Sequence, residues 1–301
     1  MVIMKKFSSI LILIAGILWG SMGLFVRELN SQGLVSMEIV ALRAIVTTVA
    51  MFLFLLFFDR KLLIIHIKDI WCFWGTGICS IVFFNFCYFK AITLTSLSVA
   101  AVLLYTAPAI VMIFSYFLFG EKFTKRKLLS LFMTFFGCVL VTGVLTDTGT
   151  ISASGIVVGL GAGLGYALYS VFSRYALQKG YHTLTIIFYT FLIAAITTFF
   201  MADIGQVVKV ATGSVTIFLF CIALGVLCTV IPYLTYTLGL QYVENSKASI
   251  LASIEPVTAT LLGVFIFREK LTVTGILGMV LVLAAMIICN ATFGRVRYNG
   301  K

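Results

Sequence analysis

The sequence predicts an all-α integral membrane protein in which ten transmembrane helices form two inverted five-helix repeats around a central cavity. Three observations carry this prediction. Of the 301 residues, 62% are hydrophobic and only 10% are charged, too few charges to cover the surface of a soluble domain of this size. Ten apolar runs each approach the length of about 20 residues that crosses the hydrocarbon core. The two halves of the chain also repeat one another at a constant spacing.

The predicted spans follow one another with short loops and leave no room for a soluble domain. They cover residues 8–26, 36–58, 71–92, 96–119, 128–146, 154–175, 184–202, 214–240, 246–267 and 272–292. The first follows Lys5 and Lys6 in the manner of a signal peptide. However, Trp19 stands where the small residues of a cleavage site would be expected. We therefore predict an uncleaved first helix.

The basic residues predict the orientation. With the N-terminus inside, 15 of the 21 Lys and Arg residues fall in the inner loops. The remaining six are Arg27, Arg43, Lys90, Lys209, Arg268 and Lys270. Because cytoplasmic loops collect Lys and Arg, we expect a multi-pass protein of the cell membrane, a bacterial plasma membrane, with both termini cytoplasmic. The net charge of +11 is thus explained by topology, and no nucleic-acid partner is expected.

An internal repeat relates the two halves. Residues 84–124 and 232–272 align without a gap at an offset of 148, which pairs Pro108 with Pro256. The first helices of the two halves align at an offset of 147. Both prolines fall close to the middle of their predicted spans.

The repeat predicts two domains, residues 1–149 and 150–301, of five helices each. Because five is odd, the second copy enters the membrane upside down relative to the first. Inverted repeats of this kind are typical of alternating-access carriers, whose site lies near the midplane at the repeat interface.

Glu255 and Pro256 stand near the middle of the ninth predicted span. Glu255 is the only carboxylate deep in any predicted span, and a charge there costs about 3 kcal/mol or more unless it faces protein or water. Pro256 removes a backbone hydrogen bond and frees the Ala252 carbonyl. Together they predict a polar cavity. Two roles stay open for Glu255: proton exchange or pairing with a substrate ammonium, and a structural hydrogen bond at the helix break.

The other candidate residues are aromatic or polar groups on helices that the repeat relates. Asn85 and Tyr88 lie one turn apart on the third span, and their equivalents on the eighth are Tyr233 and Tyr236. The candidate substrate pathway comprises Glu255, Pro256, Pro108, Trp19, Tyr105, Asn85, Tyr88, Tyr166, Tyr233, Tyr236 and Lys90. Packing, hinge and interhelical hydrogen-bonding roles are the alternatives for these residues. For Lys90 and Arg43 the expected role is snorkelling to the headgroups, with a buried pair as the alternative for Arg43.

Three motifs in order carry a resemblance to a known family. They are Trp-Gly-Ser at 19–21, the two proline-centred helices, and the paired segments FGEKFT at 119–124 and FREKLT at 267–272. With ten predicted spans in two halves, the chain resembles the EamA group of the drug/metabolite transporter superfamily. The resemblance implies ten helices around a central cavity, and transport of small metabolites, often outward export of amino acids or related compounds.

These observations predict a secondary transporter rather than an enzyme. The expected partners are a small-molecule substrate, membrane lipid and protons as a candidate coupling ion. No cofactor and no metal site are expected, because the seven cysteines fall inside apolar runs and the two histidines sit in no ligand cluster. A membrane-embedded sensor or assembly subunit and a lipid-linked transferase remain the alternatives.

Overall fold

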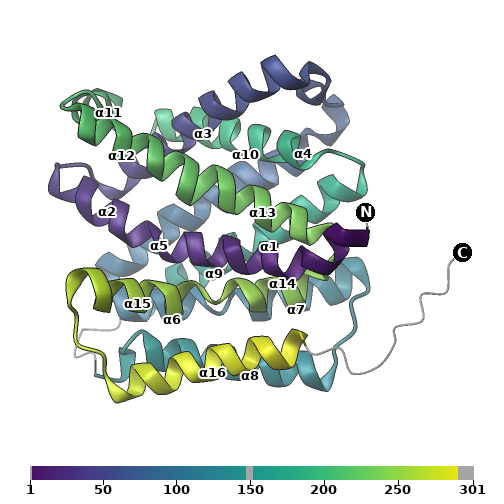
Figure 1. Cartoon of the computed structure of the whole chain (residues 1–301), viewed down its shortest axis with the longest axis vertical. Coiled ribbons are helices and arrows are strands. Elements are labelled where there is room, and N and C mark those ends of the chain that lie inside the picture. The colour runs from purple at the N-terminus through teal and green to yellow at the C-terminus, as the bar shows by residue number, and fades with distance from the viewer. Residues whose placement is uncertain (1, 147–151, 291–301) are drawn as a thin grey trace, which may run out of the picture.

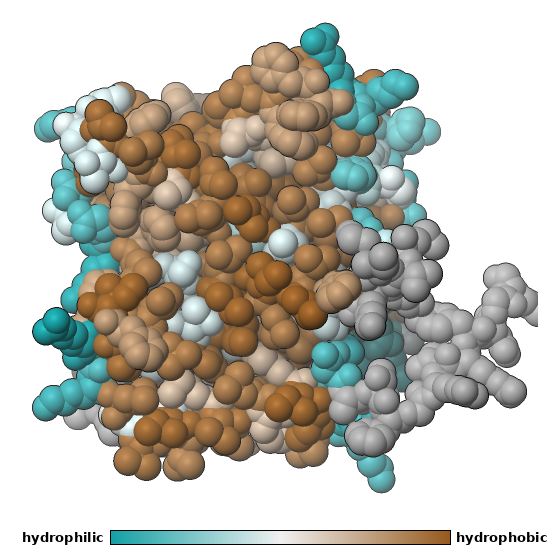
Figure 2. Space-filling view, in the orientation of Figure 1, coloured by the Kyte–Doolittle hydropathy of each residue, from teal (hydrophilic) through white to brown (hydrophobic). Residues whose placement is uncertain are grey.

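Helices make up all the regular structure in the part of the chain that the computed structural model describes, residues 2–146 and 152–290. Eight of the helical segments there are long and apolar enough to cross a membrane. Figure 1 shows the long helices running side by side. Figure 2 shows a broad hydrophobic band that runs from top to bottom through the middle of the view, with hydrophilic residues gathered along its left and right edges. The band follows from the composition, because apolar side chains face lipid and charged ones face water.

The eight spans correspond to uninterrupted or locally broken helices. In chain order these are α1 (Val2–Gly20) with α2 (Met22–Ser31); α3 (Ser36–Phe58); α4 (Ile70–Trp74) with α5 (Phe83–Leu94); α6 (Leu97–Leu104) with α7 (Ala107–Phe119); α9 (Ala153–Gln178); α12 (Val215–Gly225) with α13 (Ile231–Leu240); α14 (Asn245–Ala252) with α15 (Glu255–Phe267); and α16 (Val273–Asn290).

Two further helices are shorter than the sequence predicts. α8 (Lys125–Val141) and α10 (Thr183–Phe199) have 17 residues each. After α10 the chain bends by 111° into α11 (Ile204–Ala211), and the bent pair brings the number of candidate spans to nine. The predicted spans at 128–146 and 184–202 are therefore not matched by helices of the predicted length.

The helix breaks recur in the two halves. The interruption between α6 and α7 and that between α14 and α15 lie 148 residues apart, and each precedes a proline, Pro108 or Pro256. Proline fits the first turn of a helix because its missing N–H needs no partner there. Two π-helical segments, Gly75–Val82 and Val226–Val230, also end 148 residues apart. The sequence offset is thus reproduced as a structural offset.

Close contacts between glycines allow the outermost helices to pack. α8 lies along α16, and a Cβ atom added at Gly278 would come within 2.6 Å of the Gly137 carbonyl oxygen. Gly137 is equally close to α16, since its Cβ would lie 2.9 Å from the Gly278 carbonyl oxygen. Small residues let helix backbones approach in this way, and dispersion contacts then hold the pair.

The broken helices lie against α1 and α9. α14 and α15 contact α1, while α6 and α7 contact α9. Glycines form these contacts too: a Cβ at Gly16 would stand 2.7 Å from the Ala252 carbonyl oxygen, and one at Gly163 would stand 2.9 Å from the Leu103 carbonyl oxygen. Gly163 is the repeat equivalent of Gly16. The fold thus uses one device in both halves to hold a helix break beside a continuous helix.

Candidate functional site

A cavity of about 750 Å³ lies between the halves of the chain. Its volume falls within the range of about 300–1,000 Å³ that is typical of small-molecule sites. Eight of the eleven residues that the sequence predicts for a substrate pathway line it: Trp19, Asn85, Tyr88, Tyr105, Tyr166, Tyr233, Glu255 and Pro256. The helix bundle therefore brings residues from α1, α5, α9, α13, α15 and the α6–α7 break to one space.

Three predicted residues do not line this cavity. Pro108 is buried in the first turn of α7. Lys90 is exposed on α5. Tyr236 is buried beside a small void that adjoins Trp19. The structure thus places these three residues outside the lining of the large cavity.

Glu255 is the first residue of α15 and reaches the cavity at the break that precedes this helix. Its Oε2 accepts a hydrogen bond of 3.3 Å from the hydroxyl of Tyr166 on α9. The N-terminus of a helix carries a partial positive charge, which favours a carboxylate at this position. The break thus serves to place an acidic side chain in the cavity and to stabilise it there.

Arg43 was expected to reach the lipid headgroups, but it lies at the cavity instead. It is only 5% exposed, yet it lines the same cavity as Glu255. Its Nε donates to Thr229 Oγ1 at 3.2 Å, and its Nη1 approaches the Sδ of Met22 at 3.0 Å. The expected snorkelling is wrong, because α3 turns Arg43 toward the bundle interior and Thr229 holds it there.

Arg43 and Glu255 face the cavity without forming an ion pair. Among the described residues, no carboxylate oxygen lies within 4.0 Å of the guanidinium nitrogens of Arg43. A guanidinium group and a carboxyl group therefore line one cavity of small-molecule size without direct contact. The sequence feature that could have placed Arg43 in the cavity is its position about two turns inside its predicted span. Depth within a span was also the feature that singled out Glu255.

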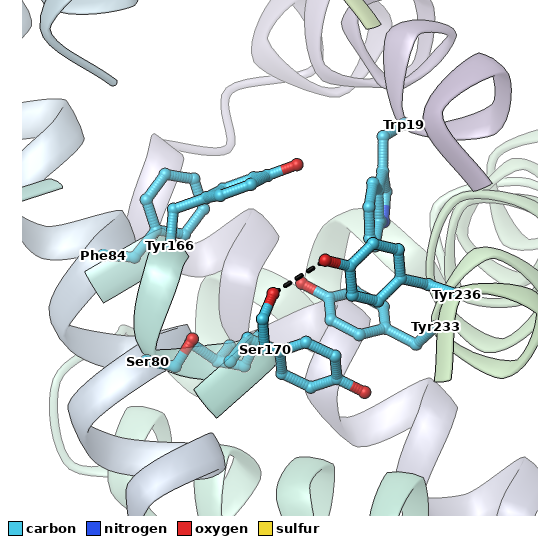
Figure 3. A pocket seen from close by; sticks show the side chains of 9 residues that line it. Trp19, Ser80, Phe84, Tyr166, Ser170, Tyr233 and Tyr236 are labelled. Atoms are coloured by element: carbon cyan, nitrogen blue, oxygen red, sulfur yellow. Dashed lines mark hydrogen bonds between the residues drawn. The ribbon is translucent and has the colours of Figure 1, made fainter. Parts of the chain in front are cut away.

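An aromatic cluster borders the cavity on one side (Figure 3). The ring centroid of Trp19 lies 6.2 Å from that of Tyr166, 5.1 Å from that of Tyr233 and 5.3 Å from that of Tyr236. The hydroxyls of Tyr236 and Ser170 share a hydrogen bond of 2.7 Å. The void among these rings measures about 10 Å³, room for about one water molecule. The Nε1–H of Trp19 is buried here and has no acceptor among the described residues.

The chain matches known transporters along its length. Residues 6–143 and 153–291 each match the EamA-like transporter family. An uncharacterized transporter of Archaeoglobus fulgidus is 36% identical over 203 residues, which cover 67% of this chain and 70% of the relative. The uncharacterized transporter YwfM of Bacillus subtilis is 24% identical over 287 residues, 94% of this chain and 93% of the relative.

The fold is also matched by a solved structure. A crystal structure superposes with a TM-score of 0.77 at 20% sequence identity, and the match covers 95% of this chain and 96% of the other. This likeness shows the fold, while the sequence matches show the family. The motifs at 19–21, 119–124 and 267–272, the doubled domain and the transporter relatives agree: the chain belongs to the EamA-like transporter family.

Proposed function

We propose that this protein is a secondary carrier that exports a small dipolar metabolite, one that bears both a carboxylate and an ammonium group as amino acids do. The observation that carries the proposal is the cavity of about 750 Å³ that Arg43 and Glu255 share without pairing. Transport would proceed by alternating access across the cell membrane, with both termini in the cytoplasm.

The proposed scaffold has ten spans in two inverted repeats, residues 1–149 and 150–301. The helices α8 and α10, with 17 residues each, would be about 25 Å long at 1.5 Å per residue. That length is at the lower end of what crosses a bilayer. Counting both as spans gives five per half, and an odd number inverts the second half. The recurrence of helix breaks and π-helical segments at an offset of 148 supports this symmetry.

The charges in the cavity support a dipolar substrate. A guanidinium binds a carboxylate through two parallel N–H donors, and the Glu255 carboxylate is a natural acceptor for an ammonium group. A substrate with both charges would satisfy Arg43 and Glu255 at once and would add no net charge to the cavity. A singly charged solute of the same size would leave one protein charge unpaired, which is costly away from water.

Glu255 is also the candidate for proton coupling. An acidic residue at mid-depth in a carrier can exchange a proton with either side as the cavity opens in turn. The two halves would rock about the helices that begin near Pro108 and Pro256. In this mechanism the Glu255→Gln variant folds, but a pH gradient does not drive transport through it. The reason is that an amide side chain does not take up or release protons at physiological pH.

The experiment uses purified full-length protein in liposomes loaded with a defined mixture of amino acids, their decarboxylated amines and their deaminated acids. Wild-type protein is expected to move the dipolar compounds fastest. Arg43→Met should abolish the preference for a carboxylate, and Glu255→Gln should abolish the preference for an ammonium group. Arg60→Met is the matched control, because Arg60 is exposed and donates only to the Leu56 carbonyl among the described residues.

Two results would overturn the proposal. Wild-type liposomes that move none of these solutes would remove the carrier function. Equal transport of the dipolar compounds by wild type, Arg43→Met and Glu255→Gln would remove the substrate class. Accumulation by Glu255→Gln against a concentration gradient, driven by pH, would exclude Glu255 as the coupling residue.

A further inference from the structure

A carboxylate with little solvent exposure links two helices at the end of the molecule where α7 stops and α14 starts (Figure 1). Glu121, just past the end of α7, accepts hydrogen bonds from the backbone N–H groups of Asn245 at 2.6 Å and of Ser246 at 3.1 Å. The Ser246 hydroxyl also donates to Glu121. The first N–H groups of a helix have no partner within the helix, so Glu121 caps α14. We call this set of contacts the inner latch.

Two basic residues complete the inner latch. Arg174, near the end of α9, donates from Nε to Oδ1 of Asn245 at 2.7 Å and from Nη2 to the Val243 carbonyl. The Lys127 ammonium lies 3.6 Å from Glu121 Oε2. The start of α14 is thereby tied to α7, α8 and α9. Charge-assisted hydrogen bonds of this kind are the stronger ones in proteins.

The repeat places equivalent residues at the opposite end of the molecule. Glu269, Leu97, Ser98 and Arg27 correspond to Glu121, Asn245, Ser246 and Arg174. The turn that presents the carboxylate has the same geometry in both halves. The Glu121 N–H donates to the Ser115 carbonyl at 3.1 Å, and the Glu269 N–H donates to its equivalent, the Gly263 carbonyl, at 3.2 Å.

The preceding residues of these turns agree as well. Gly120 has a φ of 67° and Arg268 has a φ of 55°. Arg268 is the only non-glycine residue with positive φ among the described residues. A left-handed conformation is unfavourable for an arginine side chain. The turn is thus kept in the second half at a cost, although Glu269 makes no latch contact there.

The contacts at this second end are open. The Glu269 side chain is 60% exposed, against 9% for Glu121. Its oxygen lies 3.5 Å from Nη1 of Arg27, and both residues line the mouth of the cavity together with Leu97 and Ser98. In the described part of the chain, no hydrogen bond reaches the backbone N–H of Leu97 or of Ser98.

We propose that Glu121 and Glu269 are alternating latches of the transport cycle: Glu121 caps α14 when the outer mouth is open, and Glu269 caps α6 when the inner mouth is open. Closing the outer mouth would bring the Glu269 carboxylate onto the N–H groups of Leu97 and Ser98 and onto the Ser98 hydroxyl. The proposal rests on the proposed alternating-access function, and it identifies residues that set the direction in which the empty carrier faces.

The two latches are unequal in strength. Leu97 stands where the inner latch has the Asn245 side chain, and Gly275 stands where it has Lys127. The equivalent set of residues around Glu269, which we call the outer latch, therefore lacks an amide acceptor for Arg27 and a second cation for Glu269. With fewer bonds to form, the state closed on the outside is the less populated one in the absence of substrate. The empty carrier therefore rests open toward Arg27 and Glu269.

Hydrogen–deuterium exchange of the full-length protein in lipid nanodiscs tests the latches without reference to transport. Glu121→Gln should raise exchange in peptides that begin α14 and lower it in peptides that begin α6, with a change in the ratio of the two states of about tenfold or more. Glu269→Gln should leave α14 protected and α6 open. Glu28→Gln is the control, because Glu28 is also at the outer end and accepts from the Gln32 side chain.

Two observations together separate the latch from the carrier function. If Glu121→Gln and Glu28→Gln give the same exchange pattern as wild type at α6 and α14, the latch proposal is overturned, whatever the liposome assay shows. If Glu121→Gln moves protection from α14 to α6 as expected, the latch stands even where no tested solute is transported. Rescue of α14 protection by Glu121→Asp, a shorter carboxylate, would support capping over a role in folding.

Discussion

Tyr166 of α9 donates a hydrogen bond of 3.3 Å to Glu255 at the first turn of α15. The two residues are 89 positions apart in the chain, and both line the cavity. Glu255 thus has one direct hydrogen-bond partner among the described side chains, and Arg43 lines the same cavity. The role of this hydrogen bond can therefore be tested by removing the Tyr166 hydroxyl.

Tyr166→Phe removes the hydroxyl and leaves the ring in the aromatic cluster. We expect transport in liposomes to fall about tenfold, because a hydrogen bond to a charged acceptor contributes roughly 1.5–3 kcal/mol. Tyr116→Phe is the control, since Tyr116 is 46% exposed. Wild-type flux in Tyr166→Phe would mean that the bond has no part in transport.

Gly20→Ala places a methyl group against the broken helix. Its Cβ would lie 2.5 Å from the Glu255 carbonyl oxygen and 2.7 Å from Thr258 Cβ, so α1 and α15 must move apart. We expect a loss of about 1–3 kcal/mol of stability, measured as a lower thermal midpoint in detergent. Gly23→Ala, which meets no atom within 4 Å, should melt as wild type does. Equal midpoints for the two variants would contradict the observed packing.

Gly278→Ala tests the contact between α8 and α16. The added Cβ would stand 2.6 Å from the Gly137 carbonyl oxygen, a backbone atom that cannot turn aside. A lower thermal midpoint is expected, while the order of preference among transported solutes stays as in wild type. Leu277→Ala is the neighbouring control, because Leu277 is 54% exposed toward the surface of the bundle. A larger loss of stability in the control than in Gly278→Ala would show that this crossing is loosely packed.

Lys179 and Asp69 form an ion pair of 2.7 Å beyond the end of α9. The hydrogen bond to Asp69 raises the pKa of the Lys179 ammonium above its usual value of 10.5. The stabilisation is therefore complete below the unfolded pKa and is lost as the pH rises through the higher folded pKa.

Lys179→Met should accordingly melt slightly below wild type at about pH 8, and the difference should disappear at a pH above the raised pKa of the folded-state Lys179 ammonium. The effect is small because the pair is exposed to solvent. Thermal midpoints of wild type, Lys179→Met, Asp69→Asn and the double variant at both pH values provide the check. If the difference in thermal midpoint between wild type and Lys179→Met were the same at both pH values, it would be due to lost packing of the lysine side chain and not to the ion pair.

The all-helical class and the cavity residues Glu255, Pro256 and Tyr166 were predictable from the sequence. Polar groups and helix breakers are costly in an apolar span, so their presence in such a span predicts a polar cavity inside the bundle. The lengths of α8 and α10 were not predictable in the same way, because hydropathy alone does not mark where a short helix ends. Pro108 joined the candidate pathway because the repeat relates it to Pro256, and Lys90 joined it because it lies toward the outer end of its span. Neither criterion gives the direction of a side chain.

The sequence by itself determined where apolar spans occur, which residues the repeat relates and that an acid lies at mid-depth, because these depend on composition and order along the chain. Only the tertiary structure decided that Arg43 and Glu255 line the same cavity, and that Glu121 is bonded while Glu269 is exposed. The physical reason is that the sequence sets the local backbone geometry of equivalent residues, whereas each side chain's partner depends on which other helices the fold brings beside it.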